Sequence, residues 1–253
     1  MFKRSWGSGD QLVVALHGWT GDHRHFEPLS QHVPVGSRLV AFDLPGFGAS
    51  DAPPAWDMES VGRHIAPEID AQPGDELTLL TNCSGAYAAL KAVPHLRRAP
   101  SRLVLVDAFG YAPKYFKIFT NPRWGHHAYR TTFANPLGRG ITNAVLARKK
   151  RSEGGITDTF REVNHENTLA WLRSCVALGD CRQFANVQLP TTLAFGENTF
   201  SAVRKSLPMW REIWPHVREL ELKGAGHLGV VEAAEQLASV VFARSEVQAT
   251  AQA

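Results

Sequence analysis

The amino-acid sequence predicts an α/β domain with a doubly wound, mostly parallel sheet and an inserted helical segment. Three observations predict it: short apolar runs alternate with helical patterns, the alternation stops once in mid-chain, and it resumes before the C-terminus. Buried parallel strands read as near-continuous apolar runs because helices cover both faces of the sheet. Strands that alternate with helices in this way indicate right-handed crossover connections.

The expected strands are β-branched or leucine-rich and precede loops or helical patterns. They cover residues 11–16, 38–42, 76–81, 102–107, 191–195 and 217–222, and the expected helices cover residues 58–71, 84–93, 203–214 and 231–243. Between residues 110 and 189, aromatic, basic and Gly/Pro-rich segments replace any strand signal. We therefore expect residues 1–109 and 190–253 to form the core domain and residues 110–189 to form a helical lid inserted in it.

Length and composition limit the class of protein. A chain of 253 residues with 44% apolar composition can bury one full core. No apolar run approaches the roughly 20 residues of a membrane span, and the first residues lack the apolar region of a secretory signal, so we expect a cytoplasmic protein. Cys83, Cys175 and Cys181 show no CxxC spacing. This argues against a disulfide framework and a metal site, and we expect no cofactor.

Charge is unevenly distributed along the chain. The net charge is only +3, but residues 111–155 hold nine basic residues and one acidic residue. Such a segment favours anionic partners, although a solvated basic surface without a partner explains it equally well. We expect no nucleic-acid partner. The expected partner is a small-molecule acyl substrate, for which the basic lid suggests an acidic acyl carrier protein or coenzyme A as the carrier.

The main candidate for a nucleophile is Cys83. It lies between an apolar strand and an alanine-rich helix in the segment Thr-Asn-Cys-Ser-Gly, which starts at Thr81. The segment resembles the G-x-S-x-G nucleophile elbow of α/β-hydrolases, with Cys in place of Ser. A helix N-terminus is expected to stabilise a thiolate there. Ser84 is the alternative nucleophile, but that register removes Gly85 from the position where close backbone packing needs it.

Two further segments carry the resemblance. His17-Gly-Trp follows the first expected strand, and Asp43-Leu-Pro-Gly-Phe-Gly follows the second. In the family the first loop supplies one oxyanion-hole donor, which implies the backbone N–H of Trp19. The second donor is implied to be the N–H of Ser84, immediately after the nucleophile.

The general base is expected at His227. The segment Gly-Ala-Gly-His that ends there follows a strand and precedes a helix, and it resembles the G-x-G-H loop of α/β-hydrolases. The usual acid position after the penultimate strand holds Thr199. Some family members, including certain haloalkane dehalogenases, carry the acid one strand earlier, which implies Asp107. Asn198 remains an alternative, as do Glu197 and the absence of a third member.

The resemblance covers residues 11–110 and 189–243 and is strongest to pimeloyl-[acyl-carrier protein] methyl ester esterases. It implies an acyl hydrolase, a thioesterase or an esterase of activated esters and lactones, that works through a Cys-His-acid site and a thioester acyl-enzyme. Because a thiolate leaves a tetrahedral intermediate more readily than an alkoxide does, substrates with good leaving groups are favoured. An acyltransferase or cyclase that uses the same Cys83 is the first alternative. A non-catalytic binding module on a degenerate hydrolase scaffold is the second.

Overall fold

The computed structural model describes residues 1–148 and 156–243. Its centre is a seven-stranded sheet in the order β1-β3-β2-β4-β5-β6-β7, in which β1 runs antiparallel to β3 and the other neighbours are parallel. The strands are β1 (Lys3–Gly7), β2 (Gln11–Leu16), β3 (Ser37–Phe42), β4 (Glu76–Asn82), β5 (Arg102–Val106), β6 (Thr191–Gly196) and β7 (Arg218–Leu222). This confirms the predicted α/β fold with its mostly parallel sheet.

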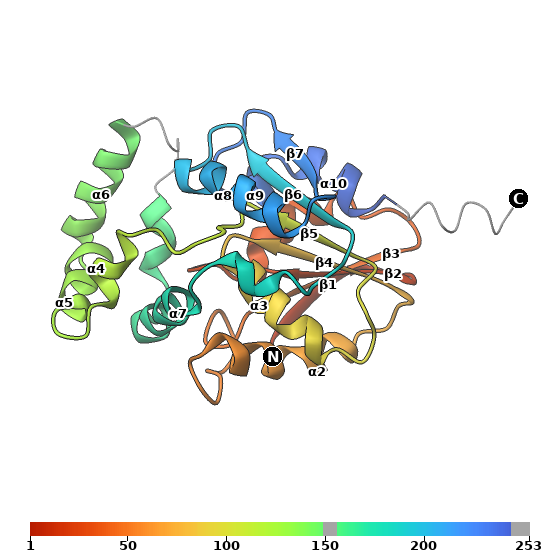
Figure 1. Cartoon of the computed structure of the whole chain (residues 1–253), viewed down its shortest axis with the longest axis horizontal. Helices are drawn as coiled ribbons and strands as arrows, with labels where there is room; N and C mark the ends of the chain where they lie inside the picture. Colours follow the sequence, from red (N-terminus) through yellow and green to blue (C-terminus); the bar gives the residue numbers. More distant parts are fainter. Residues whose placement is uncertain (149–155, 244–253) are drawn as a thin grey trace, which may run out of the picture.

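Helices cover both faces of the sheet (Figure 1). One face packs against α2 (Met58–Asp70), α3 (Gly85–Ala92) and α8 (Ser201–Ile213). The other packs against η1 (His23–Phe26), α1 (Glu27–Ser30), α9 (Gly229–Glu232) and α10 (Ala234–Val241). Alternate residues of β2 supply the two cores, with Val14 in the first and Val13 and Ala15 in the second. Both faces of a central strand are therefore buried, as its continuous apolar sequence requires.

The segment between β5 and β6 holds no strand among its described residues and is mostly helical, with turns and irregular stretches between the helices. It contains α4 (Phe116–Thr120), α5 (Gly125–Tyr129), the π-helix η3 (Arg130–Ala134), α6 (Pro136–Arg148), η4 (Ile156–Arg161), α7 (His165–Leu178) and η5 (Cys181–Phe184). Figure 1 shows α4, α5 and α6 at one end of the molecule, beyond the sheet. We call residues 110–189 the lid. A bridge between Tyr111 and Asp180 joins its two ends.

The lid has an aromatic core and one helix that enters the main core. Tyr129, Phe133, Phe160 and Leu169 form a separate buried cluster, whereas Trp171 of α7 is fully buried in the main core. Helix α7 thus packs directly against the sheet domain. Among the described helices, none has both the length and the apolarity needed to cross a bilayer.

Candidate active site

Cys83 lies at the turn from the central strand β4 into α3. Its φ is +51°, in the left-handed region, whereas Ser84 has a helical φ of −71°. A non-glycine residue held at positive φ is strained, and such residues concentrate at functional sites. Close packing maintains the turn: a Cβ at Gly18 would lie 2.7 Å from Cys83 Cβ, and one at Gly85 would collide with the His17 carbonyl oxygen. The residue that the turn lifts out of the strand is therefore Cys83, and Ser84 begins the helix.

The thiol of Cys83 is neutral at physiological pH. Burial raises its pKa to about 12, the nearby Asp107 raises it further, and the backbone amides of Ser84 and Trp19 lower it. Desolvation of a charged form outweighs the helix N-terminus here. The expectation that the helix provides a ready thiolate is therefore wrong. Attack by Cys83 requires a base that removes its proton.

Ser84 bonds to both the core and the lid. Its Oγ accepts a hydrogen bond of 3.0 Å from the backbone N–H of Trp19 and another of 3.0 Å from Nε1 of Trp171 on α7. The Trp19 amide, one of the two expected oxyanion donors, is thus directed at the nucleophile turn but is occupied by the Ser84 hydroxyl. A substrate oxygen would have to replace that hydroxyl.

His227 follows β7 and precedes α9. Its Nδ1 lies 3.4 Å from Thr199 Oγ1, and its ring packs against Phe109 and Phe200 with centroid distances of 5.6 and 4.6 Å. Burial lowers the pKa of His227 to about 4, so the imidazole is neutral and able to accept a proton. Among the described residues, no hydrogen bond joins the His227 ring to Cys83. The structure places both at the same edge of the sheet without pairing them.

Asp107 directly follows β5, has a φ of +50° and is fully buried. Its Oδ1 accepts a hydrogen bond of 3.2 Å from the Gly196 amide, while Oδ2 has no hydrogen-bond partner. Burial raises the pKa of Asp107 to about 7, against the opposing effects of the Thr199 hydroxyl and the amides of Gly196 and Gly229. The hydroxyl of Thr199 is therefore near both Asp107 and His227, which make no direct hydrogen bond.

The other candidates for the third position point elsewhere. Glu197 and Asn198 are exposed. Glu197 Oε2 accepts a hydrogen bond of 2.9 Å from the backbone N–H of Gly224, and the backbone N–H of Asn198 donates one of 2.8 Å to the Ala225 carbonyl. Neither side chain is hydrogen-bonded to His227. Both residues support the loop that carries the histidine.

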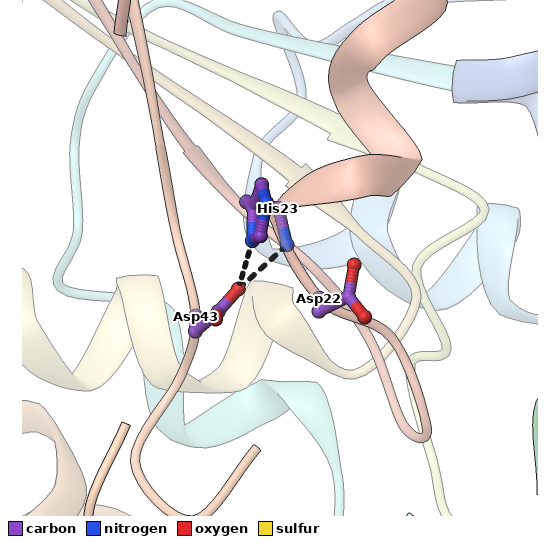
Figure 2. A group of neighbouring side chains, drawn as sticks. All are labelled: Asp22, His23 and Asp43. Atoms are coloured by element: carbon purple, nitrogen blue, oxygen red, sulfur yellow. Dashed lines mark hydrogen bonds and ion pairs between the residues drawn. The ribbon is translucent and has the colours of Figure 1, made fainter. Parts of the chain in front are cut away.

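A second group of polar residues lies at the start of η1. Atoms of Asp22, His23 and Asp43 lie within 4.8 Å of one another, which is compatible with metal ligation (Figure 2). Asp43 Oδ1 accepts hydrogen bonds from the backbone N–H and the ring of His23 at 2.8 and 2.7 Å, and its Oδ2 accepts one of 2.8 Å from the Ala49 amide. Asp22 faces Arg24, with an Nη2–Oδ2 distance of 2.6 Å. These bonds within the protein connect the loops after β2 and β3 and explain the group structurally.

Comparison of the sequence with models of protein families shows the family of this domain. A model of the alpha/beta hydrolase family matches residues 13–240, which is most of the chain. The chain belongs to the α/β hydrolase family.

Curated relatives of this α/β hydrolase match it over shorter stretches. A probable serine hydrolase from Drosophila melanogaster is 27% identical over 113 residues, which are 42% of this chain and 33% of that protein. A 2-hydroxy-6-oxononadienedioate/2-hydroxy-6-oxononatrienedioate hydrolase from Klebsiella pneumoniae is 30% identical over 109 residues, 40% of this chain and 37% of that protein. The matches thus span about a third of the length of these relatives.

Solved structures share the fold over nearly the whole chain. A thermophilic esterase from Thermogutta terrifontis superposes with a TM-score of 0.73 at 18% identity, covering 95% of this chain and 90% of that one. The enol-lactonase from Burkholderia xenovorans LB400 gives 0.69 at 17% identity, covering 95% and 94%. At these identities the likeness shows the fold.

Sequence reasoning missed two residues at the α/β hydrolase site. Trp171 donates to Ser84 from a lid helix for which the sequence offers no motif. In the sequence, Thr199 drew notice only because it occupies the position where the family usually has its acid. In the structure, its hydroxyl contacts His227. The position of Thr199 in the family's acid loop was the available signal, because a side chain there faces the histidine whatever its type.

Proposed function

We propose that this α/β hydrolase is an acyl hydrolase in which Cys83 attacks the acyl carbon and forms a thioester acyl-enzyme. The observation that carries the proposal is the left-handed backbone of Cys83 at the end of the central strand, with the amides of Trp19 and Ser84 beside its thiol. Strained residues at the ends of parallel strands are where this fold supports catalysis. The hydrolase names of the curated relatives agree with this class of reaction.

The proposed reaction starts from two neutral groups. The Cys83 sulfur forms a bond to the carbonyl carbon while its proton passes to the imidazole of His227 after the two side chains approach each other. The carbonyl electrons move onto oxygen, where the two amides stabilise the negative charge. The bond to the leaving group then breaks, and the leaving group takes the proton from His227. Water, deprotonated by the same imidazole, then attacks the thioester carbon. The carbon–sulfur bond breaks, the Cys83 sulfur takes the proton back from His227, and the acid is released.

Leaving-group chemistry limits the substrates. A thiolate is expelled from the tetrahedral intermediate more readily than an alkoxide, so attack on a simple alkyl ester reverses. Thioesters, enol lactones and aryl esters avoid this reversal because their leaving groups depart easily. We therefore propose a thioesterase or an esterase of activated esters and lactones.

Asp107 is proposed as the third member of the site, acting through Thr199. Burial keeps the carboxyl partly protonated near neutral pH, with a pKa of about 7. The Thr199 hydroxyl lies 3.4 Å from His227 Nδ1 and close to Asp107. We propose that it accepts the Nδ1 proton and donates its own to the carboxyl, which would hold the ring in place. Asp107 is thus a positioning residue and does not touch the substrate.

The proposed partner is an anionic acyl carrier. No carboxylate occurs in residues 111–152, and the basic residues of this part of the lid favour the phosphates of coenzyme A or an acidic acyl carrier protein. The segments His17-Gly-Trp and Asp43-Leu-Pro-Gly-Phe-Gly, which resemble those of pimeloyl-[acyl-carrier protein] methyl ester esterases, are the sequence basis for proposing a carrier of this class. Hydrolysis should weaken as salt is added, and kinetics independent of salt would exclude a charge-based role of the lid.

Acyl transfer is the second candidate function. The lid residues Phe116 and Leu172 line the small cavity beside Cys83, and cover of this kind restricts water. Product analysis with and without a nucleophilic acceptor distinguishes transfer or cyclisation from hydrolysis. The binding-module alternative applies if no acyl probe modifies Cys83.

The deciding experiment compares an acyl thioester and an aryl ester in wild type, Cys83→Ala, Ser84→Ala and His227→Ala, with intact mass spectrometry of the quenched enzyme. We expect Cys83→Ala and His227→Ala to lose turnover and wild type to gain the mass of the acyl group. Ser84→Ala should retain the acyl-enzyme. An inactive Ser84→Ala beside a fully active Cys83→Ala would move the nucleophile to Ser84.

A further inference from the structure

Exposed apolar side chains are concentrated in the lid. Nine large hydrophobic residues are exposed in the described part of the chain, and six of them lie between residues 115 and 145: Tyr115, Ile118, Trp124, Leu137, Ile141 and Val145. Single exposed hydrophobic residues are ordinary on a protein surface, but a concentration of them indicates a contact surface. Helices α4, α5 and α6, which carry or adjoin these residues, lie together at one end of the molecule (Figure 1).

Helix α6 presents its apolar face to the solvent. Leu137, Ile141 and Val145 recur every four residues, which places them on one face of the helix, and they are 77%, 69% and 46% exposed. The other exposed residues between positions 137 and 145 are Gly140 and Ala144, so this face carries no polar side chain. A surface helix normally turns its polar face outward and its apolar face inward. In the outward face of α6, which we define as these five residues, that arrangement is reversed.

The polar residues of α6 contact the rest of the lid. Arg139 Nη1 donates hydrogen bonds of 2.9 and 3.0 Å to the carbonyl oxygens of Phe133 and Ala134 in η3. Arg139 and Asn143 also line a cleft to which Arg161 of η4 contributes. Turning the helix to bury its apolar face would break the bonds that Arg139 makes. These contacts therefore hold the apolar face toward the solvent.

The chain around this face carries positive charge. Residues 111–148 contain six Lys or Arg residues and no Asp or Glu. Glu166 of α7 offsets one of the six, Arg130, with an N–O distance of 3.5 Å. Three others, Lys114, Lys117 and Arg123, are exposed in or next to helices α4 and α5, at the same end of the molecule as α6 (Figure 1). An apolar face near exposed cations favours a surface that combines acyl chains with negative charge.

Other occupants fit these observations less well. A second copy of the chain would bring two basic segments together, and like charges repel. An acidic protein would meet the exposed lysines, but the outward face of α6 offers it no side-chain hydrogen-bond donor. The acyl substrate is separate from this face, because no described residue that lines the cavity beside Cys83 lies on α6. A bilayer that contains anionic lipids supplies both negative charge and an apolar interior.

We propose that the outward face of α6 binds the surface of a membrane that contains anionic lipids, with Leu137, Ile141 and Val145 among the acyl chains and the exposed basic residues of the lid at the headgroups. Helix α6 has 13 residues, a length of about 20 Å, whereas a membrane span needs about 30 Å. The helix would therefore lie along the membrane surface. The proposal goes beyond the acyl hydrolysis proposed above and does not depend on it.

Vesicle sedimentation tests the binding. We expect the protein to bind vesicles of phosphatidylcholine and phosphatidylglycerol at least about tenfold more tightly than vesicles of phosphatidylcholine alone, and to dissociate as salt is added. Ile141→Ser should weaken binding to the anionic vesicles about tenfold, because it removes an inserted side chain. Val35→Ser is the matched control: Val35 is also β-branched and is fully exposed, but it lies in the turn before β3. It should bind as wild type does.

A double variant and the oligomeric state complete the test. Leu137→Ser/Ile141→Ser should weaken vesicle binding about hundredfold and, since both side chains are exposed, should keep the circular dichroism spectrum and Tm of wild type. Absence of wild-type binding to the anionic vesicles, or equal binding by Ile141→Ser and wild type, would overturn the proposal. So would a wild-type dimer, seen by sedimentation equilibrium without lipid, that the double variant converts to a monomer, because the face would then bind a second copy. Hydrolysis enters none of these measurements, so their failure leaves the proposed reaction intact.

Discussion

Two neighbouring strands of the sheet end in the same backbone conformation but present their polar groups to different surroundings. Cys83 after β4 and Asp107 after β5 have φ values of +51° and +50°. Cys83 lines a cavity and is only partly buried as a residue, whereas the Asp107 carboxyl is fully buried behind Thr199. A left-handed residue at a strand end thus directs its side chain toward the edge of the sheet that holds the candidate site, and the surrounding residues determine whether that side chain is accessible.

The largest effect is expected when the Cys83 thiol is removed. Cys83→Ala should lower kcat/KM for an acyl thioester by about a thousandfold or more, because no other group would form the acyl-enzyme. Asp107→Asn should have a far smaller effect, since Asp107 does not contact the substrate. Steady-state kinetics on both variants measure the difference. Equal losses would show that the two strand ends act as one unit.

The pH dependence of kcat/KM should report on both His227 and Asp107. Because the pKa of His227 is lowered to about 4, its base form persists as the pH falls, and kcat/KM should decline with a midpoint near pH 4. Ionisation of Asp107, with a pKa of about 7, should add a smaller step near pH 7. Asp107→Asn should remove only that step. A single midpoint at 6.5 in wild type would contradict the buried environment of the imidazole.

The thermal stability of the protein should depend on pH because the Asp107 carboxyl is buried. Its folded-state pKa is raised, so its contribution to stability is fully present below about pH 4 and is lost as the pH rises through about 7. Wild type should therefore lose thermal stability between pH 4.5 and 8. The side chain of Asp107→Asn does not ionise. We therefore expect the difference in Tm, variant minus wild type, to be larger at pH 8 than at pH 4.5 by at least about 3 °C. A constant Tm difference would mean that the carboxyl is solvated.

The smallest effect is expected at the hydroxyl between the two strand ends. Thr199→Val keeps the shape and removes the hydroxyl, so kcat should fall about fivefold with little change in KM. The step near pH 7 should disappear as well, because Asp107 loses its route to His227. Thr199→Ser should restore both. Failure of Ser to rescue would assign Thr199 a packing role.

The sequence predicted the six parallel strands and missed β1. That strand reads Lys-Arg-Ser-Trp-Gly from Lys3 and lies at the edge of the sheet, mostly exposed, so it lacks the apolar pattern of the others. Charged residues are common on edge strands because they discourage pairing with other chains. The other edge strand, β7, is also largely exposed, but its leucines alternate with charged residues and gave a strand signal that β1 lacks.

The site was predictable only as far as local motifs determine it. The turn at Cys83 and the loop at His227 follow from short glycine patterns, because backbone space there is set by residues close in sequence. The bond from Trp171 to Ser84 joins residues 87 positions apart and depends on how the lid packs. The expected thiolate was wrong for the same reason: burial beneath distant segments sets the pKa of Cys83, and no local pattern encodes it.

The hydroxyl of Ser84 has a consequence for protein engineering. It accepts one bond from the loop after β2 and one from α7, so the residues at 84 and 171 are matched to each other. In a chimera that takes its lid from a homologue without an indole at the position of Trp171, Ser84 Oγ would lose the hydrogen bond that it accepts from α7. Exchanging the lid as an independent module should therefore succeed only when both positions are transferred together.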